Sequence, residues 1–592
     1  MALQPALRLH TQSNALHCVP SARPATTEQR ADGCCVSVAR SATLALLIAL
    51  SAWHVAAETL TYTLEPLPKT GGIRVEFTWA TSGRGGSLMG VSPRWGNITD
   101  VPALLGDFVV QGAKAVRRDG ARWIVEHDRG ASFTVRYEVR PPRRTFDWSD
   151  THLPITTHSF FHGMGNAFLL VPESGGDVPR EFDVILRWKL PAGWRSACSW
   201  GVGRSVGARV AATDVRHSVY LAGELVIEKS EQDGRSVTVA MVDQFGFRAP
   251  RFLALAHRVI AAQCEFMGEK SFPEFVITAI PVGAPLPDGN TRASGSGLYH
   301  SFALYLAPRS QLNDAVEHLF AHELFHYWNG RLLGAAKPEE LVYWWIEGFT
   351  DYYALRILHD SRMWGDELFL KWLNRHIRDY YANPAIGESN EVIGRDFWKR
   401  RDTAGEMAYQ RGLMLAVRWH ALARRAGVAD GLDALFLAMI QRARQGAFEL
   451  TNDAIRTVGA ERLGRWFAAE FDQYVIGAAT IDLPEDALTP AFRGRIARIH
   501  EFDLGFDRER SLKSKTAVGV VKGSAAARAG LREGDKLVGW KLHGDPDQKI
   551  ALDVLRGENT RKISYFPRGE SRSVIQFAPA GAKDAAQPAD PE

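Results

Sequence analysis

The chain has 592 residues, which at about 150 residues per domain suggests roughly four domains. Its residues are 46% hydrophobic and 23% charged, with a formal net charge of +4, a composition typical of globular proteins. This composition excludes a chain that is disordered or fibrous as a whole. The nearly balanced charge gives no indication of binding to nucleic acid or to an anionic membrane surface.

The first 57 residues predict an export signal. An apolar run over residues 42–57 follows Arg40 and ends in Val55-Ala56-Ala57, the small-residue pattern that a signal peptidase reads. The run is shorter than the about 20 residues that a membrane span needs. We therefore predict a leader over residues 1–57, an exported protein in the periplasm or outside the cell, and no membrane contact beyond the leader. An uncleaved anchor and a buried helix are the alternatives.

Two cysteines, Cys198 and Cys264, follow the leader. In an oxidising compartment they could form a disulfide. Their separation in sequence says nothing about geometry, so two buried free thiols are the equal alternative.

Residues 58–245 have the pattern of half-buried strands. Ile73, Val75, Phe77 and Trp79 alternate with polar residues, and period-two alternation is typical of a strand with one buried face. We predict an all-β, sandwich-like first domain over this range.

The pattern changes after residue 245. Residues 251–267 predict a helix, 274–280 and 300–306 predict short strands, and nearly every segment from Gln311 to about residue 475 has helical periodicity and composition. A third change near residue 500 leads into short strand-like runs. The chain thus divides into a leader (1–57), an all-β domain (58–245), a mostly helical α+β domain (246–495), a small β-rich domain (496–580) and a disordered tail (581–592).

The strongest chemical signal is the segment His322-Glu323-Leu324-Phe325-His326. Residues four apart lie on the same face of a helix, so both imidazoles can reach one metal ion. Glu323 would then lie beside a metal-bound water as a general base. Hydrolytic zinc sites hold the ion by three protein ligands and leave a fourth position open.

The third ligand is predicted from a second segment, Trp344-Trp345-Ile346-Glu347-Gly348-Phe349-Thr350-Asp351. On a helix, Glu347 would complete the ligand set for one Zn²⁺ ion. Asp351 lies one turn further on the same face, where it can accept a hydrogen bond from a ligand imidazole and fix its tautomer.

Together these motifs, with Tyr327-Trp328-Asn329 and Tyr352-Tyr353 beside them, resemble the glycyl aminopeptidase family of gluzincin zinc peptidases. That resemblance implies a β-rich N-terminal domain, a thermolysin-like catalytic domain and a C-terminal PDZ domain, in the order of the three composition zones. It implies zinc ligation by His322, His326 and Glu347 and a general-base role for Glu323.

The related aminopeptidases carry a Tyr-x-Lys-Gly motif whose tyrosine stabilises the oxyanion. This chain has Tyr409-Gln410-Arg411-Gly412 before the helical run over residues 413–425. The resemblance therefore assigns the oxyanion role to Tyr409, and a tyrosine that only packs at the helix start is the alternative.

One departure concerns specificity. The family's Gly-Gly-Leu-Glu-His segment lies on the edge strand of the active site, and its glutamate is the expected anchor of the substrate's free amino group. Here the segment reads Ser296-Gly297-Leu298-Tyr299-His300. Gly297 and Tyr299 are thus expected at the substrate, but a phenol cannot offer a carboxylate's charge to an ammonium group. Asp288, in the preceding loop, could compensate.

The PDZ expectation depends on Leu504-Gly505-Phe506, which resembles a loop that receives a peptide carboxylate. It also depends on the run over residues 526–535, where a helix is expected to end at Gly530 and a turn to lead into a strand over 536–540. Such domains bind a chain terminus by adding a strand. A module that only packs against the catalytic domain is the equal alternative.

These observations predict a secreted zinc metallopeptidase, an aminopeptidase that favours small N-terminal residues, with a peptide or protein as its partner. The first alternative is an endopeptidase that needs no free N-terminus, which Tyr299 favours. The second is a peptide-binding protein whose PDZ domain is functional and whose zinc site is vestigial. The sequence does not determine the oligomeric state.

Overall fold

The computed structural model describes residues 58–82, 85–142, 146–173, 180–286, 291–446, 448–542 and 544–581. The predicted leader, Asp288 and the predicted tail beyond residue 581 lie outside the described residues. Within them, no helix has the length and apolar character that crossing a bilayer requires.

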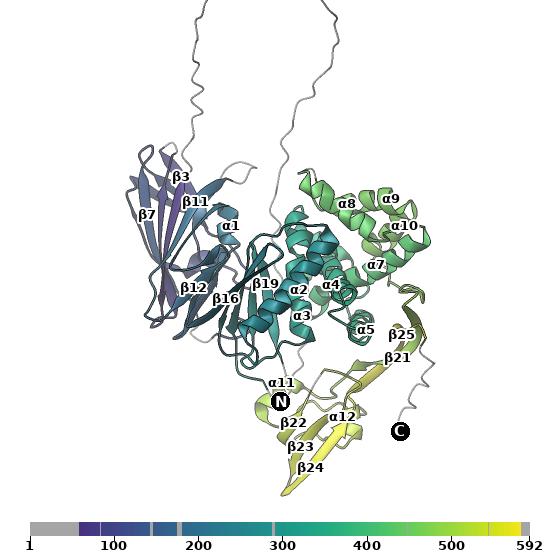
Figure 1. The fold of residues 1–592 in the computed structure, drawn as a ribbon. Coiled ribbons are helices and arrows are strands. Elements are labelled where there is room, and N and C mark those ends of the chain that lie inside the picture. Colours follow the sequence, from purple (N-terminus) through teal and green to yellow (C-terminus); the bar gives the residue numbers. More distant parts are fainter. Residues whose placement is uncertain are drawn as a thin grey trace, which may run out of the picture.

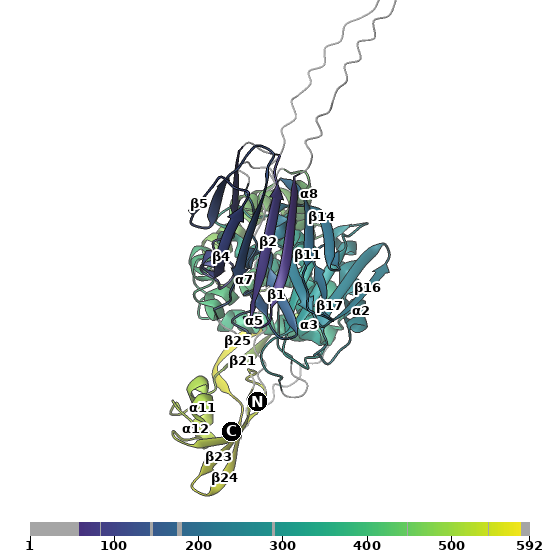
Figure 2. The ribbon, with the colours of Figure 1, turned by 90° about the vertical axis from the view of Figure 1, so that its left-hand side faces the viewer.

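Three regions follow one another along the chain (Figure 1): a β-rich region in purple and blue, a helical region in teal and green beside it, and a small region in yellow. The view in Figure 2 shows β1, β2 and β11 side by side on the face of the β-rich region, with the small C-terminal region projecting beyond the other two. The structure therefore has the multidomain arrangement, β-rich then helical, that the sequence predicts.

The β-rich region is built from three sheets around one apolar core. Their strand orders are β14-β11-β1-β2-β7-β4, β10-β3-β6-β5 and β13-β12-β15-β9-β8. The alternation seen in the sequence is the reason: in β2, Ile73, Val75, Phe77 and Trp79 are all buried in this core. The elements are β1 (Thr59–Leu67), β2 (Gly72–Ala80), β3 (Gly86–Gly90), β4 (Leu105–Gln111), β5 (Ala115–Asp119), β6 (Arg122–Glu126), β7 (Ser132–Val139), β8 (Ile155–Thr156), β9 (Phe160–Met164), β10 (Val171–Pro172), β11 (Glu181–Trp188), β12 (Arg195–Cys198), β13 (Gly201–Val202), β14 (Ser205–Ala211), α1 (Ala212–Arg216) and β15 (Val219–Gly223).

The helical region contains a five-stranded mixed sheet in the order β16-β17-β18-β20-β19. Its strands are β16 (Leu225–Gln232), β17 (Arg235–Val242), β18 (Phe275–Pro281), β19 (Ala293–Leu298) and β20 (Ser301–Leu306). β17, β18 and β20 run parallel, whereas β19 is antiparallel to β20 and forms one edge. Two strands from the segment predicted for the first domain, β16 and β17, thus belong to this sheet. Alternation predicts a strand but not the sheet that it joins.

Nine helices complete this region: α2 (Ala249–Met267), α3 (Asp314–Phe325), α4 (Tyr343–Asp360), α5 (Asp366–Ala382), α6 (Asn390–Asp396), α7 (Glu406–Arg425), α8 (Asp433–Arg444), α9 (Asn452–Leu463) and α10 (Trp466–Phe471), counted over the described residues. They and the sheet share one large core. Cys198 and Cys264 are both buried and both free, so the structure contains the two thiols and not the disulfide.

The C-terminal region contains β21 (Phe492–Phe502), α11 (Arg508–Ser514), α12 (Ala525–Arg528), β22 (Lys536–Lys541), β23 (Ile550–Arg556), β24 (Asn559–Tyr565) and β25 (Arg568–Pro579). β21 and β25 pair with each other and connect it to the helical region. There, the side chain of Asn374 on α5 accepts from Phe577 N at 2.7 Å and donates to Phe577 O at 2.8 Å. The first element after Phe506 is α11, not the strand-like run expected from the sequence.

Candidate zinc site

The two histidines of the motif project from the end of α3. The helix begins at an N-cap, Asn313, whose side chain accepts a hydrogen bond from Val316 N at 3.3 Å. Nε2 of His322 lies 3.0 Å from Nε2 of His326. Both side chains are buried, so the helical spacing places two imidazole nitrogens at one point inside the protein.

Glu347 on α4 reaches the same point. Its Oε2 atom lies 3.4 Å from Nε2 of His322 and 3.5 Å from Nε2 of His326, and one donor atom of each residue lies within 4.8 Å of the other two. Oε2 of Glu347 is buried and has no hydrogen-bond partner among the described residues. Tetrahedral zinc with bonds near 2.0 Å brings its ligand atoms about 3.3 Å apart, so this donor set fits one zinc ion.

Neighbouring groups orient both imidazoles. Nδ1 of His322 lies 2.7 Å from Oδ1 of Asp351, one turn after Glu347 on α4. Nδ1 of His326 lies 2.9 Å from the carbonyl oxygen of Asn329. Because each Nδ1 atom makes a hydrogen bond, the Nε2 atoms of the two imidazoles face each other and Glu347.

The charges of the site are strongly coupled. Burial alone would lower the pKa of His322, but the charges of Asp351 and Glu347 outweigh burial and raise that pKa to about 10. Burial alone would raise the pKa of Glu347, but His326 and His322 hold it well below its usual range. The three side chains therefore offer a carboxylate and a replaceable proton to an arriving cation.

Asn329 is a residue whose role the sequence did not reveal, although it follows the histidine pair directly. Its fully buried side chain donates to the carbonyl oxygen of Ile346 at 3.1 Å and to the Thr350 hydroxyl at 3.0 Å, and accepts from Nε1 of Trp345 at 3.0 Å. It thereby joins the end of the histidine helix to the first turns of α4. A buried amide with every contact on the neighbouring ligand helix fixes the distance between the ligands.

Glu323 faces the edge strand β19. Its Oε2 atom accepts a hydrogen bond from Gly297 N at 2.8 Å, while its Oε1 atom is buried without a partner among the described residues. Burial raises the pKa of Glu323 to about 7. A Cβ atom on Gly297 would lie 3.0 Å from Glu323 O and 3.3 Å from Oε2, so glycine lets the strand approach the carboxylate. Such a carboxylate can exchange a proton near neutral pH.

Tyr409 lies in the first turn of α7, which begins at Glu406, seven residues before the start of the helical run expected from the sequence. Its ring stacks on that of His322 with centroids 5.9 Å apart, and its hydroxyl accepts from Nη2 of Arg401 at 3.2 Å. Tyr409 is thus adjacent to the ligand set. Arg401, in the π-helical turn before α7, is a second neighbour that the sequence did not reveal.

Arg411, which replaces the lysine of the related motif, is not part of this site. Its buried guanidinium donates to the Asn390 side chain at 2.8 Å and to the carbonyl oxygens of Ile386 and Glu388 at 3.0 and 2.7 Å. The positive charge holds the segment around the start of α6. Arg411 therefore anchors this segment and does not contact the zinc site.

Tyr299 directly follows β19 but turns to the β-rich region. The Arg331 guanidinium lies 4.3 Å from the centre of its ring, and its backbone N donates to the carbonyl oxygen of His217 at 2.7 Å. Arg331 also donates to Asp214 at 3.1 Å. The structure thus puts a cation against the residue at the position expected for the amine anchor.

Leu504 and Phe506 are buried in the small core of the C-terminal region. Gly505 has a positive φ of 75°, its N–H donates to the Asp503 carboxylate at 2.8 Å, and its carbonyl oxygen accepts from Val521 N at 2.9 Å. The loop has the left-handed turn that glycine favours. Binding of a chain terminus there stays a prediction.

Comparison with known proteins shows what these features are similar to. Residues 315–395, which carry the histidine pair, Glu347 and Asp351, match the M61 glycyl aminopeptidase family. The fold is similar to that of an aminopeptidase N family protein from Idiomarina loihiensis, with 14% identity, 88% of this chain and 98% of that chain covered, and a TM-score of 0.65. An M1 zinc metallopeptidase from Deinococcus radiodurans has 15% identity, covers 72% of this chain and 94% of its own, and has a TM-score of 0.47. No curated protein matches the chain.

The family match covers the two helices that supply the predicted ligands, and the aminopeptidase fold extends over most of the chain. His322, His326 and Glu347 converge inside the matched segment and fit one zinc ion. These findings support a zinc metallopeptidase, with a segment similar to the M61 glycyl aminopeptidase family and a fold similar to that of an aminopeptidase N family protein.

Proposed function

We propose that the protein is an exported aminopeptidase that removes single, small residues from the N-terminus of peptides. The observation that carries this proposal is the convergence of three ligand side chains with the Glu323 carboxylate beside them, inside a segment that matches a glycyl aminopeptidase family. Export follows from the predicted leader and is tested by N-terminal sequencing of the mature protein.

Each residue of the site has a separate role in peptide hydrolysis. His322, His326 and Glu347 would hold zinc, which as a Lewis acid makes a water molecule a nucleophile near neutral pH and polarises the peptide carbonyl. Glu323 takes the proton of the attacking water on its buried carboxylate and gives it to the leaving amine. The raised pKa of Glu323 suits both steps. Gly297 N holds this carboxylate in place at 2.8 Å.

Tyr409 supplies a hydroxyl for the oxygen that becomes negatively charged during attack. Arg401 donates to that hydroxyl at 3.2 Å and its guanidinium lies 5.0 Å from the centre of the ring, which restrains the phenol and favours donation of its proton to an anionic acceptor. Removing one such donor typically costs about 10²–10³ in kcat.

The second candidate function is that of an endopeptidase. It is favoured by the contact between Arg331 and Tyr299, because a cation at the expected amine anchor does not attract an ammonium group. The PDZ-like binding of a chain terminus at Leu504, Gly505 and Phe506 is a further, separate proposal, tested by titrating the protein with peptides that differ only in a free or amidated C-terminus.

The deciding experiment uses peptide pairs that are identical except for a free or an acetylated N-terminus. The zinc-loaded protein and its Glu323→Gln variant are incubated with each pair, and products are identified by mass spectrometry. Loss of single N-terminal residues from the free peptides alone supports the aminopeptidase. Internal cleavage of both members supports the endopeptidase, and products equal to those of Glu323→Gln contradict peptide hydrolysis by this site.

A further inference from the structure

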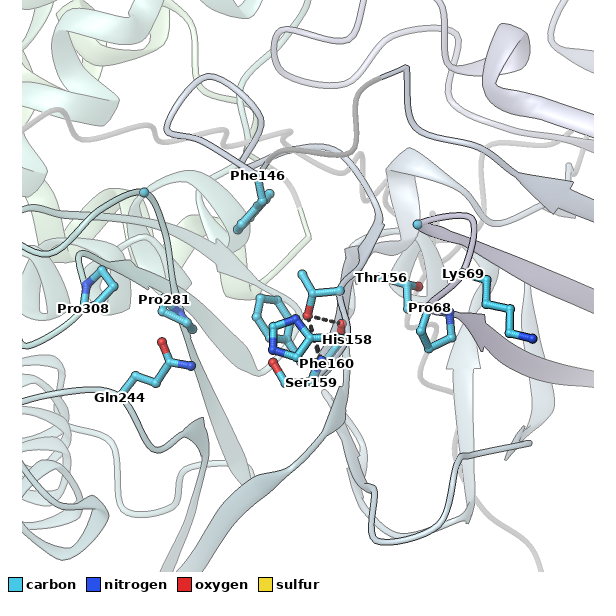
Figure 3. Close-up of a pocket in the computed structure, with 13 residues that line it drawn as sticks. Pro68, Lys69, Phe146, Thr156, His158, Ser159, Phe160, Gln244, Pro281 and Pro308 are labelled. Atoms are coloured by element: carbon cyan, nitrogen blue, oxygen red, sulfur yellow. Dashed lines mark hydrogen bonds between the residues drawn. The ribbon is translucent and has the colours of Figure 1, made fainter.

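The edge strand β19 lines a second feature, a pocket of about 440 Å³. Its lining comes from four parts of the chain: Asn97, the segment around Trp148, the start of β19, and the turn that carries Trp398 and Arg401. A different cavity of about 420 Å³ is lined by Phe146, the β1–β2 turn and the strand end at Pro281 (Figure 3). That cavity contains no residue of the zinc site or of β19.

Two residues that line the 440 Å³ pocket connect it to the surroundings of the zinc site. Arg401 lines it and donates to the Tyr409 hydroxyl. Ser294 also lines it, three residues before Gly297 on the same strand, and Gly297 N contacts the Glu323 carboxylate. At about 3.3 Å per residue, the pocket begins about 10 Å along the strand from the catalytic carboxylate. An extended peptide would cover that distance in about three residues.

The direction along β19 decides which part of a substrate lies there. Tyr299, at the position expected for the amine anchor, follows Gly297, whereas Ser294 precedes it. A substrate whose N-terminal end lies toward Tyr299 therefore has the residues that follow the scissile bond toward Ser294. This assignment rests on the proposed peptidase function.

The pocket contains two fixed guanidinium groups. The Arg292 guanidinium lies 4.2 Å from the centre of the Trp148 ring, and that of Arg401 lies 4.8 Å from the centre of the Phe397 ring. Stacking fixes the plane of a guanidinium, and its in-plane N–H donors match the two oxygens of a carboxylate. Among the described residues of the lining, Asp147 is the one carboxylate, and its Oδ1 atom accepts from Trp148 N at 2.7 Å.

A third polar group points to a ligand. The Ser294 hydroxyl is 1% exposed and has no hydrogen-bond partner among the described residues, although a buried hydroxyl normally has one. We propose that this pocket, lined by Arg292, Arg401 and Ser294, is a specificity site for a carboxylate in the part of the substrate that follows the scissile bond. That carboxylate is either the C-terminus of a short peptide or an acidic side chain.

The test compares substrates that differ in one charge. One arm is Gly-Ala-Ala and Gly-Ala-Ala-Ala, each with a free or an amidated C-terminus. The other arm is Gly-Glu-Ala-amide against Gly-Gln-Ala-amide and Gly-Ala-Glu-amide against Gly-Ala-Gln-amide. The zinc-loaded full chain should cleave the carboxylate member of at least one arm with a kcat/KM about tenfold higher, the effect of one charge-assisted hydrogen bond. The arm that responds identifies the source of the carboxylate.

The variants assign the preference to Arg292. In Arg292→Gln the ratio of acidic to neutral kcat/KM should fall toward one, and Arg292→Lys should restore part of it. The matched control is Arg118→Gln, because Arg118 also stacks on a tryptophan, 5.0 Å from the centre of the Trp123 ring, but lies outside the pocket. That variant should keep the wild-type ratio.

Equal cleavage of the acidic and neutral members by the wild-type enzyme, or a preference that survives Arg292→Gln, would overturn the inference while leaving the peptidase function intact. If no peptide is cleaved, the peptidase function fails, and calorimetric binding of the same pairs to Glu323→Gln still decides the inference. Tighter binding of the carboxylate member supports it, and equal binding of the two members overturns it.

Discussion

The close contact between α4 and α7 suggests a test of what fixes the distance between the residues of the site. α4 and α7 meet at Gly348 and Gly412, and a Cβ atom on Gly412 would lie only 1.8 Å from the carbonyl oxygen of Trp344. Glu347 precedes Gly348, and Tyr409 lies one turn before Gly412. The contact between the two glycines therefore fixes the distance between a zinc ligand and the tyrosine beside it.

The predicted perturbation is Gly412→Ala. Cβ contacts shorter than 3.0 Å essentially do not occur, so the two helices would have to separate by roughly 1.2 Å, and such overpacking costs about 1–3 kcal/mol. A misplacement of about 1 Å can cost about 10²-fold in rate. We expect a Tm lower by several degrees, weaker zinc binding and a kcat/KM about 100-fold lower, measured by thermal unfolding, zinc titration and peptide hydrolysis.

The direction of the change in stability on Gly412→Ala decides this test. In a helix interior without steric conflict, alanine is more favourable than glycine by about 1 kcal/mol, so a tolerant contact would make Gly412→Ala more stable than the wild type. Gly387→Ala, in the turn before α6, is a control for the substitution itself, because a Cβ atom there meets nothing within 4 Å. Unchanged or increased stability together with full activity in Gly412→Ala would refute the reasoning.

Three further predictions follow from the same site and its surroundings. Asp351→Asn removes the carboxylate that orients His322 and should weaken zinc binding about 10–100-fold. Asp360→Asn, a substitution at an exposed position on the same helix, should leave the affinity unchanged. Equal zinc affinities of Asp351→Asn and the wild type would contradict the orienting role. The pKa of His322 is raised to about 10 in the metal-free chain, whereas zinc binds the neutral imidazole, so zinc binding should release a proton. The affinity for zinc should therefore rise by about one decade per pH unit between pH 6 and 9. Calorimetry in buffers of different ionisation enthalpy measures the released proton, and a pH-independent affinity would be inconsistent with this proton release. Cys198 and Cys264 are free and buried, so a reductant should leave the Tm unchanged, and a large decrease would reveal a disulfide.

The sequence predicts the parts of the site whose geometry is local. Four-residue spacing on one helix brings His322 and His326 together, and the same spacing on α4 puts Asp351 one turn beyond Glu347. These relations hold in any helix, so they follow from the chain without its tertiary structure. The edge position of the strand with Gly297 came from the family resemblance, and the structure agrees.

The remaining parts of the site depend on packing between distant segments. Asn329 and Arg401 were not predicted as contributors, because their contacts with α4 and with Tyr409 arise only once the helices pack together. The inclusion of β16 and β17 in the second sheet has the same cause: alternation shows a buried face but not its partner. Arg411 shows that a motif match alone does not place a residue at the site. Its positive charge matches that of the lysine in the related motif, but its guanidinium contacts the segment before α6 and not the zinc ligands.

The central claim is that one zinc ion held by His322, His326 and Glu347 makes this protein a peptidase. The most direct measurement titrates zinc into the metal-free protein and records bound zinc and peptide hydrolysis together. Activity should rise linearly with added zinc and reach its maximum at one zinc per chain. Glu347→Ala should bind zinc far more weakly and remain inactive at that ratio. Glu367→Ala, a substitution at an exposed position on α5, should match the wild type. Full hydrolysis after exhaustive chelation, or wild-type activity in Glu347→Ala, would contradict the account.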